Sequence, residues 1–299
     1  MANCISCGRE LRTSLFGGRG NVCTDCRNNA IVMNTAGPVA TPMPQPRPVA
    51  RSYPPVTTVL VGINVAVFVA MLFSGVPLET PNTTQLLKWG ADFGPLSLGP
   101  QPWRILTSNY LHIGILHIGL NMWCLWNLGI LAERIFDRWT YVLTYTVCGI
   151  AGSLASLWWH PLVVGAGASG AIFGLAGALI TALYLGKLPI PKQAMRGTMK
   201  SLLTFAGYNL VFGAVGAGID NSAHVGGLVA GLILGAVFAK HLASPADVRA
   251  RWGIAVFLAA FFLLFTFFNF VKHANGRVSP PPEETSMVVS PRSPVVGNT

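Results

Sequence analysis

Long apolar runs separated by polar turns dominate the chain from about residue 56 onward. A helix needs roughly 20 mostly apolar residues to cross a bilayer, and each run comes close to that length. The pattern predicts seven spanning helices, at Val56–Phe73, Ile113–Leu131, Thr140–Trp159, Ala168–Leu185, Ser201–Ile219, Ala223–Ala239 and Trp252–Val271. The segments before the first run and after the last one are polar and proline-rich, so they are not expected to enter the membrane.

Composition and charge support a polytopic membrane protein. Of the 299 residues, 52% are hydrophobic and only 10% are charged, which excludes an ordinary soluble domain. The net charge of +10 does not indicate nucleic acid as a partner, because the basic residues are scattered between apolar runs. With a cytoplasmic N-terminus, eleven Lys and Arg residues lie beside inner helix ends and four beside outer ends. This excess predicts a cytoplasmic N-terminus, an outer C-terminus and a bacterial plasma membrane, with lipid around the helices.

Two Cys-x-x-Cys pairs precede the first apolar run, Cys4 with Cys7 and Cys23 with Cys26. Each pair places two sulfurs on one tight turn, and two such turns supply the four ligands of a tetrahedral zinc site. Two disulfides are the alternative, but the cytoplasm keeps thiols reduced, which favours a structural zinc ion. The sequence leaves open whether this module recruits a substrate, recruits a cytosolic protein partner, or only stabilises the N-terminus.

The stretch Gly165 to Gly177 opens the fourth apolar run and contains Ser169. A hydroxyl in hydrocarbon must find a partner, and glycines let another helix come close enough to bring one. Phe173 shares the face of the serine. A stripe without side chains lies beside that face, formed by Gly170, Gly174 and Gly177. Alone, this pattern is typical of helix packing, so the chemistry depends on polar residues elsewhere.

The sixth run has a matching helix face without bulky side chains, and His224 lies at the N-terminal end of that face. That face continues through Gly227, Gly231 and Gly235. In the second run, His117 and Asn121 are four residues apart and share a face near the outer end of the helix. His112 lies too far round the same helix to join them, and we expect it only at the helix entry.

The predicted topology brings these polar side chains to one depth in the membrane. The second, fourth and sixth helices run inward, so their first turns all lie near the outer surface. A serine hydroxyl needs a base, and a neutral imidazole such as His224 is suited to taking its proton. No Asp or Glu lies in these helices near His224, which predicts a Ser-His dyad whose ring is oriented by packing. Asn121, His117 and the Ser169 N–H are suitable donors to an oxyanion.

Four motifs resemble, in order and in position, those of the rhomboid intramembrane serine proteases. They are Trp103-Arg104, His117-x-x-x-Asn121, Gly167-Ala168-Ser169-Gly170 and Ala223-His224-x-x-Gly227. The resemblance covers roughly Val56 to Lys240. It implies a serine endopeptidase that cleaves transmembrane helices of membrane proteins without a catalytic cofactor. It also implies Ser169 as nucleophile, His224 as base and His117 with Asn121 at the oxyanion hole, and that Phe173 packs against the histidine.

The predicted fold is all-α and polytopic, with a rhomboid-like six-helix core, a seventh C-terminal transmembrane helix and a small zinc-ribbon-like module at the N-terminus. The expected domains are the zinc module at 1–36, a proline-rich linker at 37–55, the core at 56–240, the additional helix at 241–274 and a disordered tail at 275–299. The segment Ser74–Tyr110 is unusually long for a connection, which suggests that it covers or gates a site. Its Trp103-Arg104 pair is typical of a headgroup anchor.

Two other functions stay open. A non-catalytic rhomboid-like protein would bind or escort membrane helices, but such proteins typically lack the serine or the histidine, and this chain has Ser169 and His224. A small transporter would have intramembrane histidines as well. It would also show internal repeats and a site at the membrane midplane, and neither is evident in the sequence.

Overall fold

The computed structural model of the chain describes residues 2–11, 22–27, 54–188, 190–215 and 219–275. The chain divides into two compact units, Met1–Ser52 and Tyr53–Thr299. The described part of the first unit contains one antiparallel pair, β1 (Ala2–Asn3) with β2 (Glu10–Leu11). The predicted linker and C-terminal tail lie almost entirely outside the described residues, and the predicted domain boundaries stay predictions.

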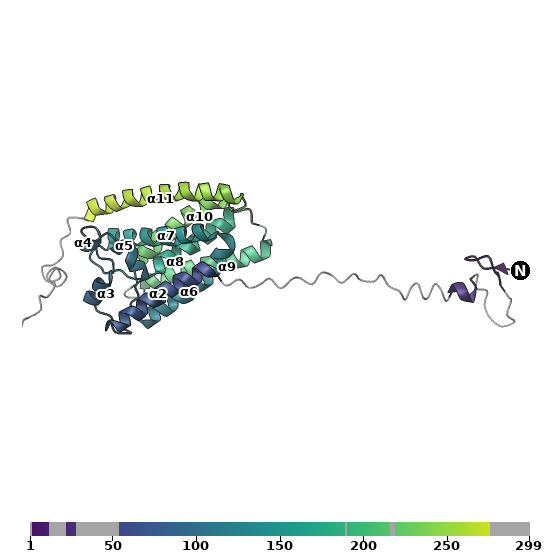
Figure 1. Ribbon diagram of the computed structural model, residues 1–299, viewed down its shortest axis with the longest axis horizontal. Helices are drawn as coiled ribbons and strands as arrows, with labels where there is room; N and C mark the ends of the chain where they lie inside the picture. Colours follow the sequence, from purple (N-terminus) through teal and green to yellow (C-terminus); the bar gives the residue numbers. More distant parts are fainter. Residues whose placement is uncertain (1, 12–21, 28–53, 189, 216–218, 276–299) are drawn as a thin grey trace, which may run out of the picture. The chain divides into compact units, whose positions relative to one another are not determined.

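The described residues of the second unit form a bundle of long helices, with short helices gathered at one end (Figure 1). The long helices are α2 (Pro55–Phe73), α6 (Ile115–Ile135), α7 (Arg138–Trp159), α8 (Ser169–Leu185), α9 (Lys192–Val215), α10 (Asn221–Ala239) and α11 (Ala246–Asn275). The short ones are α3 (Thr83–Trp89), α4 (Gly94–Ser97), α5 (Arg104–Thr107) and the 3-10 turn η1 (Ser108–Tyr110). Within the described residues, each of the seven predicted apolar runs therefore coincides for most of its length with one long helix.

Helix α8 is the centre of this bundle. It is buried along most of its length and packs against α6, α7, α9 and α10. A helix that is hydrophobic all round suits such a central position. The residue that begins it, Ser169, is consequently surrounded by other helices from the first turn onward.

Glycines hold α8 and α10 in direct backbone contact. A β-carbon added at Gly227 would collide with the carbonyl oxygen of Gly170, and one added at Gly231 would collide with that of Gly174. Small residues allow this close approach. The prediction that the glycine faces of the fourth and sixth apolar runs contact each other is confirmed. The contact also sets how far apart the first turns of α8 and α10 can lie.

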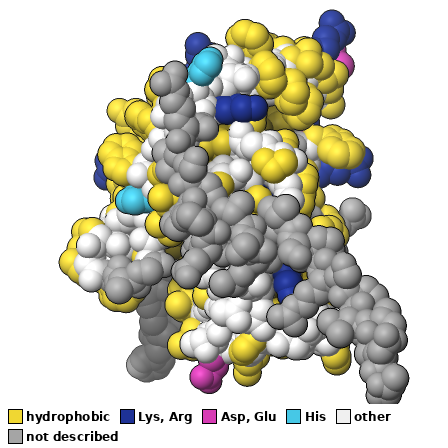
Figure 2. Space-filling view, turned by 90° about the vertical axis from the view of Figure 1, so that its left-hand side faces the viewer, with side chains coloured by type: hydrophobic (Ala, Val, Ile, Leu, Met, Phe, Trp, Pro, Cys, Tyr) yellow, Lys and Arg dark blue, Asp and Glu magenta, His cyan; other side chains and the backbone are white. Residues whose placement is uncertain are grey.

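Among the helices of the described residues, five are long and apolar enough to cross a membrane, namely α2, α6, α7, α10 and α11. Helix α8 is apolar but shorter, with 17 residues. Large hydrophobic side chains are exposed on the helices that surround it, and Figure 2 shows such side chains reaching the surface. A soluble protein rarely exposes so much apolar surface, so the chain is an integral, multi-pass membrane protein.

The fifth helix differs from its prediction. The predicted helix begins at Ser201, whereas α9 (Lys192–Val215) already begins at Lys192. The residues from Lys192 to Lys200 include Lys, Gln, Ala, Met and Arg, which are good helix formers. Their polar side chains end the apolar surface of the run, but the helix continues through them.

The long segment before α6 packs through a buried arginine. Arg104 is only 4% exposed and donates hydrogen bonds to the carbonyl oxygens of Leu87 (2.7 Å) and Ala91 (3.0 Å). The expectation that Trp103 and Arg104 form a headgroup anchor is therefore wrong for the arginine, although Trp103 is 50% exposed. The physical reason is that buried carbonyls at the C-terminal end of α3 and in the turn after it need donors, and a guanidinium carries five N–H groups.

Candidate active site

Ser169 and His224 meet at the first turns of two helices. Ser169 is the first residue of α8, and its Oγ lies 2.9 Å from Nε2 of His224 in the first turn of α10. The His224 ring stacks on Phe173, with ring centroids 4.3 Å apart and planes 14° apart. The structure thus brings together a hydroxyl and an imidazole that are 55 residues apart in sequence.

His117 and Asn121 come from α6, on the same face and one turn apart. Nδ1 of His117 accepts a hydrogen bond from the backbone N–H of Ile113 at 3.2 Å. A ring nitrogen that accepts carries no hydrogen, so the neutral ring has its hydrogen on Nε2. The Asn121 amide donates one hydrogen to the carbonyl oxygen of His117 at 2.9 Å and keeps a second one to give.

Gly167 lies between the His117 ring and Ser169. A β-carbon added at Gly167 would lie 3.1 Å from Nε2 of His117 and 3.8 Å from Oγ of Ser169, so both groups border the same small space. The φ angle of Gly167 is +144°, a backbone conformation that L side chains rarely adopt. Glycine at this position therefore gives the turn before α8 and leaves room between the ring and the hydroxyl.

One cavity of about 670 Å³ contains all four predicted site residues, Ser169, His224, His117 and Asn121. Its walls come from α6, α8, α9, α10 and the connection before α8. The cavity is mostly apolar with a few converging polar groups, which is typical of a substrate site. Its chemistry combines a hydroxyl nucleophile, a base within hydrogen-bond reach and N–H donors beside them, as acyl transfer requires.

Two polar residues near this site were missed in the sequence, and the expectation that His112 lies away from His117 is wrong. The His112 ring is fully buried and lies 5.3 Å from the His117 ring, because α6 begins only at Ile115 and His112 belongs to the preceding loop. Asp220 is the N-cap of α10 and accepts from the N–H of Ala223. Asn221 begins that helix, and its Oδ1 lies 3.3 Å from Nδ1 of His224. An Asp-Asn-Ser sequence before an apolar run is a helix-start signal that could have identified the last two.

Asp92 is a buried carboxyl group behind the site. It lines a small cavity of about 50 Å³ that also reaches Ser169 and Asp220. Its Oδ1 has no hydrogen-bond partner among the described residues. Burial raises the pKa of Asp92 to about 7, and the nearby Asp220 adds to the rise, while Ser97 opposes it.

We expect this carboxyl group to make the stability of the protein pH-dependent. An unfolded Asp has a pKa of about 4. Between about pH 4 and the folded value of about 7, the folded protein holds a proton that the unfolded chain has released. The free energy of unfolding should therefore fall as pH rises through this range, and Asp92→Asn should remove that part of the fall. Thermal unfolding in detergent, followed from pH 4.5 to 8, measures this.

Asp247 supplies the control, because its carboxylate is exposed beside Arg251 on α11. Asp247→Asn should leave the slope of stability against pH as it is in the wild type. An Asp92→Asn protein with an unaltered slope would contradict the account of the buried carboxyl group.

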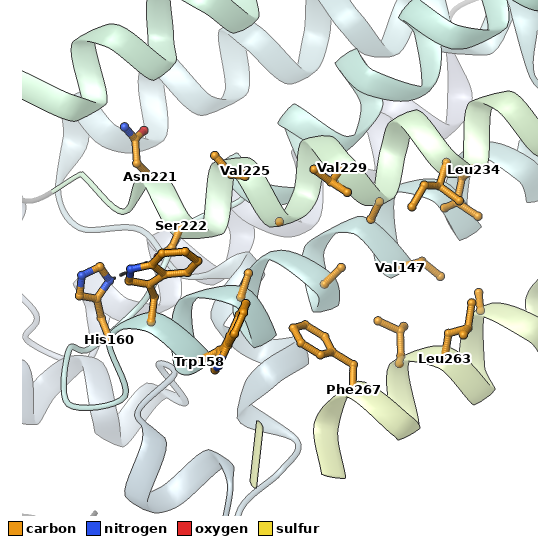
Figure 3. A pocket seen from close by; sticks show the side chains of 18 residues that line it. Val147, Trp158, His160, Asn221, Ser222, Val225, Val229, Leu234, Leu263 and Phe267 are labelled. Atoms are coloured by element: carbon orange, nitrogen blue, oxygen red, sulfur yellow. Dashed lines mark hydrogen bonds between the residues drawn. The ribbon is translucent and has the colours of Figure 1, made fainter. Parts of the chain in front are cut away.

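A second cavity, of about 650 Å³, lies between α7, α10 and α11 and is almost entirely apolar. Figure 3 shows side chains from these three helices facing one another across it, with His160 hydrogen-bonded to Ser222 at one end. Neither Ser169 nor His224 lines it. Its lining pairs Ser222 with His160, but at 3.4 Å, and the Ser222 hydroxyl donates its hydrogen to the carboxylate of Asp220. His160 is therefore not placed to take that proton, and this cavity is not the candidate active site.

The four N-terminal cysteines lie together in the first unit. The Sγ atoms of Cys4, Cys7, Cys23 and Cys26 are all within 4.8 Å of one another, and those of Cys7 and Cys23 are 3.7 Å apart. Four thiolates around a tetrahedral zinc ion, with Zn–S bonds of about 2.3 Å, have sulfurs about 3.8 Å apart. Backbone N–H groups of Cys23 and Cys26 point at Sγ of Cys4 and Cys23. The cluster therefore fits a metal ion.

Comparison with known proteins gives a consistent result. The family model of the Rhomboid domain matches residues 99–241. The chain is 33% identical over 235 residues to Rhomboid protease GluP of Bacillus subtilis, which covers 79% of this chain and 43% of that protein. It is 34% identical over 170 residues to RHOMBOID-like protein 7 of Arabidopsis thaliana, or 56% and 53% of the two chains.

A third relative is covered more fully. The chain is 29% identical over 200 residues to Rhomboid protease AarA of Providencia stuartii, which is 60% of this chain and 70% of that protein. By contrast, the chain spans about half the length of the first two relatives. All three alignments are longer than the matched domain, and two of the relatives are named as proteases.

Proposed function

The chain belongs to the rhomboid family, and we propose that it is an intramembrane serine endopeptidase that cleaves transmembrane helices of other membrane proteins. The observation that carries this proposal is the 2.9 Å contact between Ser169 Oγ and His224 Nε2, inside a cavity that also holds His117 and Asn121. The resemblance of the four sequence motifs implies these roles for the same residues and so supports the proposal. No cofactor is needed for this chemistry.

In the proposed reaction, Ser169 attacks the carbonyl carbon of the scissile peptide bond while Nε2 of His224 takes the hydroxyl proton. The tetrahedral intermediate collapses when His224 gives that proton to the leaving amine, and the C–N bond breaks. Water then attacks the acyl-enzyme, again with His224 as base, and releases the second product and the free serine.

Three N–H groups would stabilise the oxyanion. They are Nε2–H of His117, the second hydrogen of the Asn121 amide and the backbone N–H of Ser169. The hydrogen bond from Ile113 to Nδ1 supports the role of His117, because it leaves Nε2 as the donor. Donors held in place before the reaction cost no reorganisation, and one of them is typically worth about 10² to 10³ in rate.

The proposed substrate is a transmembrane helix that unwinds at small or helix-breaking residues near the outer face. We propose a cytoplasmic N-terminus and an outer C-terminus from the distribution of Lys and Arg, with α11 as an additional span after the six-helix core. In this orientation, the first turns of α6, α8 and α10 lie near the outer surface of a bacterial plasma membrane.

A fluorophosphonate probe tests the function directly. The purified wild type should be labelled on Ser169 and should cleave a model transmembrane substrate in detergent, because the probe reacts with an activated serine. Ser169→Ala should do neither. Ser201→Ala, an exposed serine on α9, should do both and serves as the control. A folded wild type that neither labels nor cleaves would contradict the proposal and favour a non-catalytic escort of membrane helices.

We also propose a structural zinc ion at Cys4, Cys7, Cys23 and Cys26. The purified protein should contain about one zinc ion per chain, and Cys4→Ser should lose it. Cys124→Ser, in α6, should keep it.

A strong chelator should release the ion and unfold the N-terminal module, which hydrogen exchange would detect. Substrate cleavage should persist, because the metal has no role in the reaction. A chain without zinc, with its thiols oxidised to disulfides, would contradict this assignment. The partner of this module would be a cytosolic protein or the substrate.

A further inference from the structure

Asn221 is the residue that faces the second nitrogen of the His224 ring. It is the first residue of α10, one turn before His224, and its Oδ1 lies 3.3 Å from Nδ1. We propose that Asn221 is a positioning residue that orients the His224 ring toward Ser169 and is itself held by α9. This inference rests on the proposed function and adds a third group to the Ser-His dyad.

The orientation of the Asn221 amide is set from outside α10. Its Nδ2 donates to the carbonyl oxygen of Leu210 in α9 at 2.9 Å. An amide has donors only on nitrogen and acceptors only on oxygen, so the bond to Leu210 turns Oδ1 toward Nδ1 of His224. In Figure 3 the Asn221 amide points away from the apolar cavity, in accordance with these partners.

This arrangement selects one form of the imidazole. An oxygen acceptor beside Nδ1 favours the neutral ring that carries its hydrogen there. Nε2 then has a free lone pair toward Ser169 Oγ, 2.9 Å away, and can take the hydroxyl proton. Stacking on Phe173 constrains the plane of the ring but not which edge faces Ser169. The hydrogen bond from Nδ1 to Asn221 makes that choice.

The nearest carboxylate is engaged elsewhere. Asp220 Oδ1 accepts from the hydroxyl of Ser222 and from the N–H of Ala223, so it caps α10. Asp220 thus fixes the start of the helix, and Asn221 supplies the contact to the ring. Histidine with an asparagine behind it is known from cysteine proteases, which shows that a neutral amide can fill this role.

Gly213 on α9 provides a second way to disturb the same amide. A β-carbon added at Gly213 would collide with Oδ1 of Asn221. The atom that must move is the end of a side chain, so Gly213→Ala should fold while pushing the amide away from His224. Gly207, on the same helix, has no atoms within 4 Å of an added β-carbon and offers a matched control.

The test compares Asn221→Ala, Asn221→Asp and Gly213→Ala with Gly207→Ala and Asn127→Ala. Asn127 is on the exposed side of α6, and among the described residues its amide bonds only within its own helix, to the carbonyl oxygen of Trp123. We expect Asn221→Ala and Gly213→Ala to lower kcat about 10-fold with KM unchanged, the rate equivalent of one hydrogen bond. Asn221→Asp keeps the acceptor oxygen and should retain more activity than Asn221→Ala. Both controls should match the wild type.

Nitrogen NMR of ¹⁵N-histidine-labelled protein shows which ring nitrogen of His224 carries the hydrogen. A loss of stability alone would not change this signal. The wild-type His224 ring should carry its hydrogen on Nδ1, and Asn221→Ala should shift it toward a mixture of both forms. Wild-type rates of cleavage and fluorophosphonate labelling in Asn221→Ala, with an unaltered His224 spectrum, would overturn the inference. A wild type without any reaction would instead refute the proposed function, and the spectra alone would then decide the role of Asn221. If Asn221→Ala does not fold, Asn221→Asp and Gly213→Ala carry the comparison.

Discussion

Replacing His224 with alanine should lower cleavage of a transmembrane substrate by about 10⁴-fold or more. A serine hydroxyl is a weak nucleophile at its own pKa, and Nε2 of His224 is the base that lies within 2.9 Å of Ser169 Oγ. The loss should appear in kcat, because the ring acts in the transition state and not in substrate binding. Initial rates in detergent, at equal amounts of folded protein, measure it.

The double variant sharpens this prediction. Ser169→Ala with His224→Ala should be no slower than either single variant, since residues that act as a unit lose their effect together. His273→Ala, an exposed histidine in the last turn of α11, is the matched control and should keep full activity. A His224→Ala protein that retains more than about a tenth of the wild-type rate would exclude the histidine as the base.

Gly231→Ala should destabilise the protein by about 3 kcal/mol or more, or prevent it from folding. A β-carbon at this position would collide with the carbonyl oxygen of Gly174 and lie 2.8 Å from its Cα. These are backbone atoms in the middle of the central helix, so no side chain can move aside. The two helices would have to separate, which would also part Ser169 from His224.

Thermal unfolding in detergent measures this effect, and Gly62→Ala controls for it. Gly62 is in α2, another apolar helix, and an added β-carbon there meets no atom within 4 Å. Alanine at Gly62 should therefore leave stability unchanged or raise it slightly, because alanine favours helix. If Gly231→Ala unfolds at the wild-type temperature, the close contact between α8 and α10 is not what holds the bundle together.

Much of this protein can be predicted from its sequence, because the membrane limits the alternatives. A long apolar run in a membrane must be a helix, so hydropathy predicts where the seven helices lie, although it does not predict the polar first turns of α9. Glycines spaced by one turn predict the contact of α8 with α10, and a histidine at the head of one stripe predicts a partner at the head of the other. The Cys-x-x-Cys pairs predict four sulfurs close together, since each pair shares one turn.

Only the tertiary structure decided which other side chains surround these residues. The sequence could not place His112 beside His117, because it did not reveal that α6 begins only at Ile115, three residues after His112. It could not reveal that Arg104 is buried, because the partners of Arg104 are backbone carbonyls at and just after the end of α3, 17 and 13 residues earlier. Nor could it connect Asn221 to Leu210 of α9. Hydropathy reports the surroundings of a helix averaged over its length, whereas these contacts depend on where each helix begins and how far it is rotated against its neighbours.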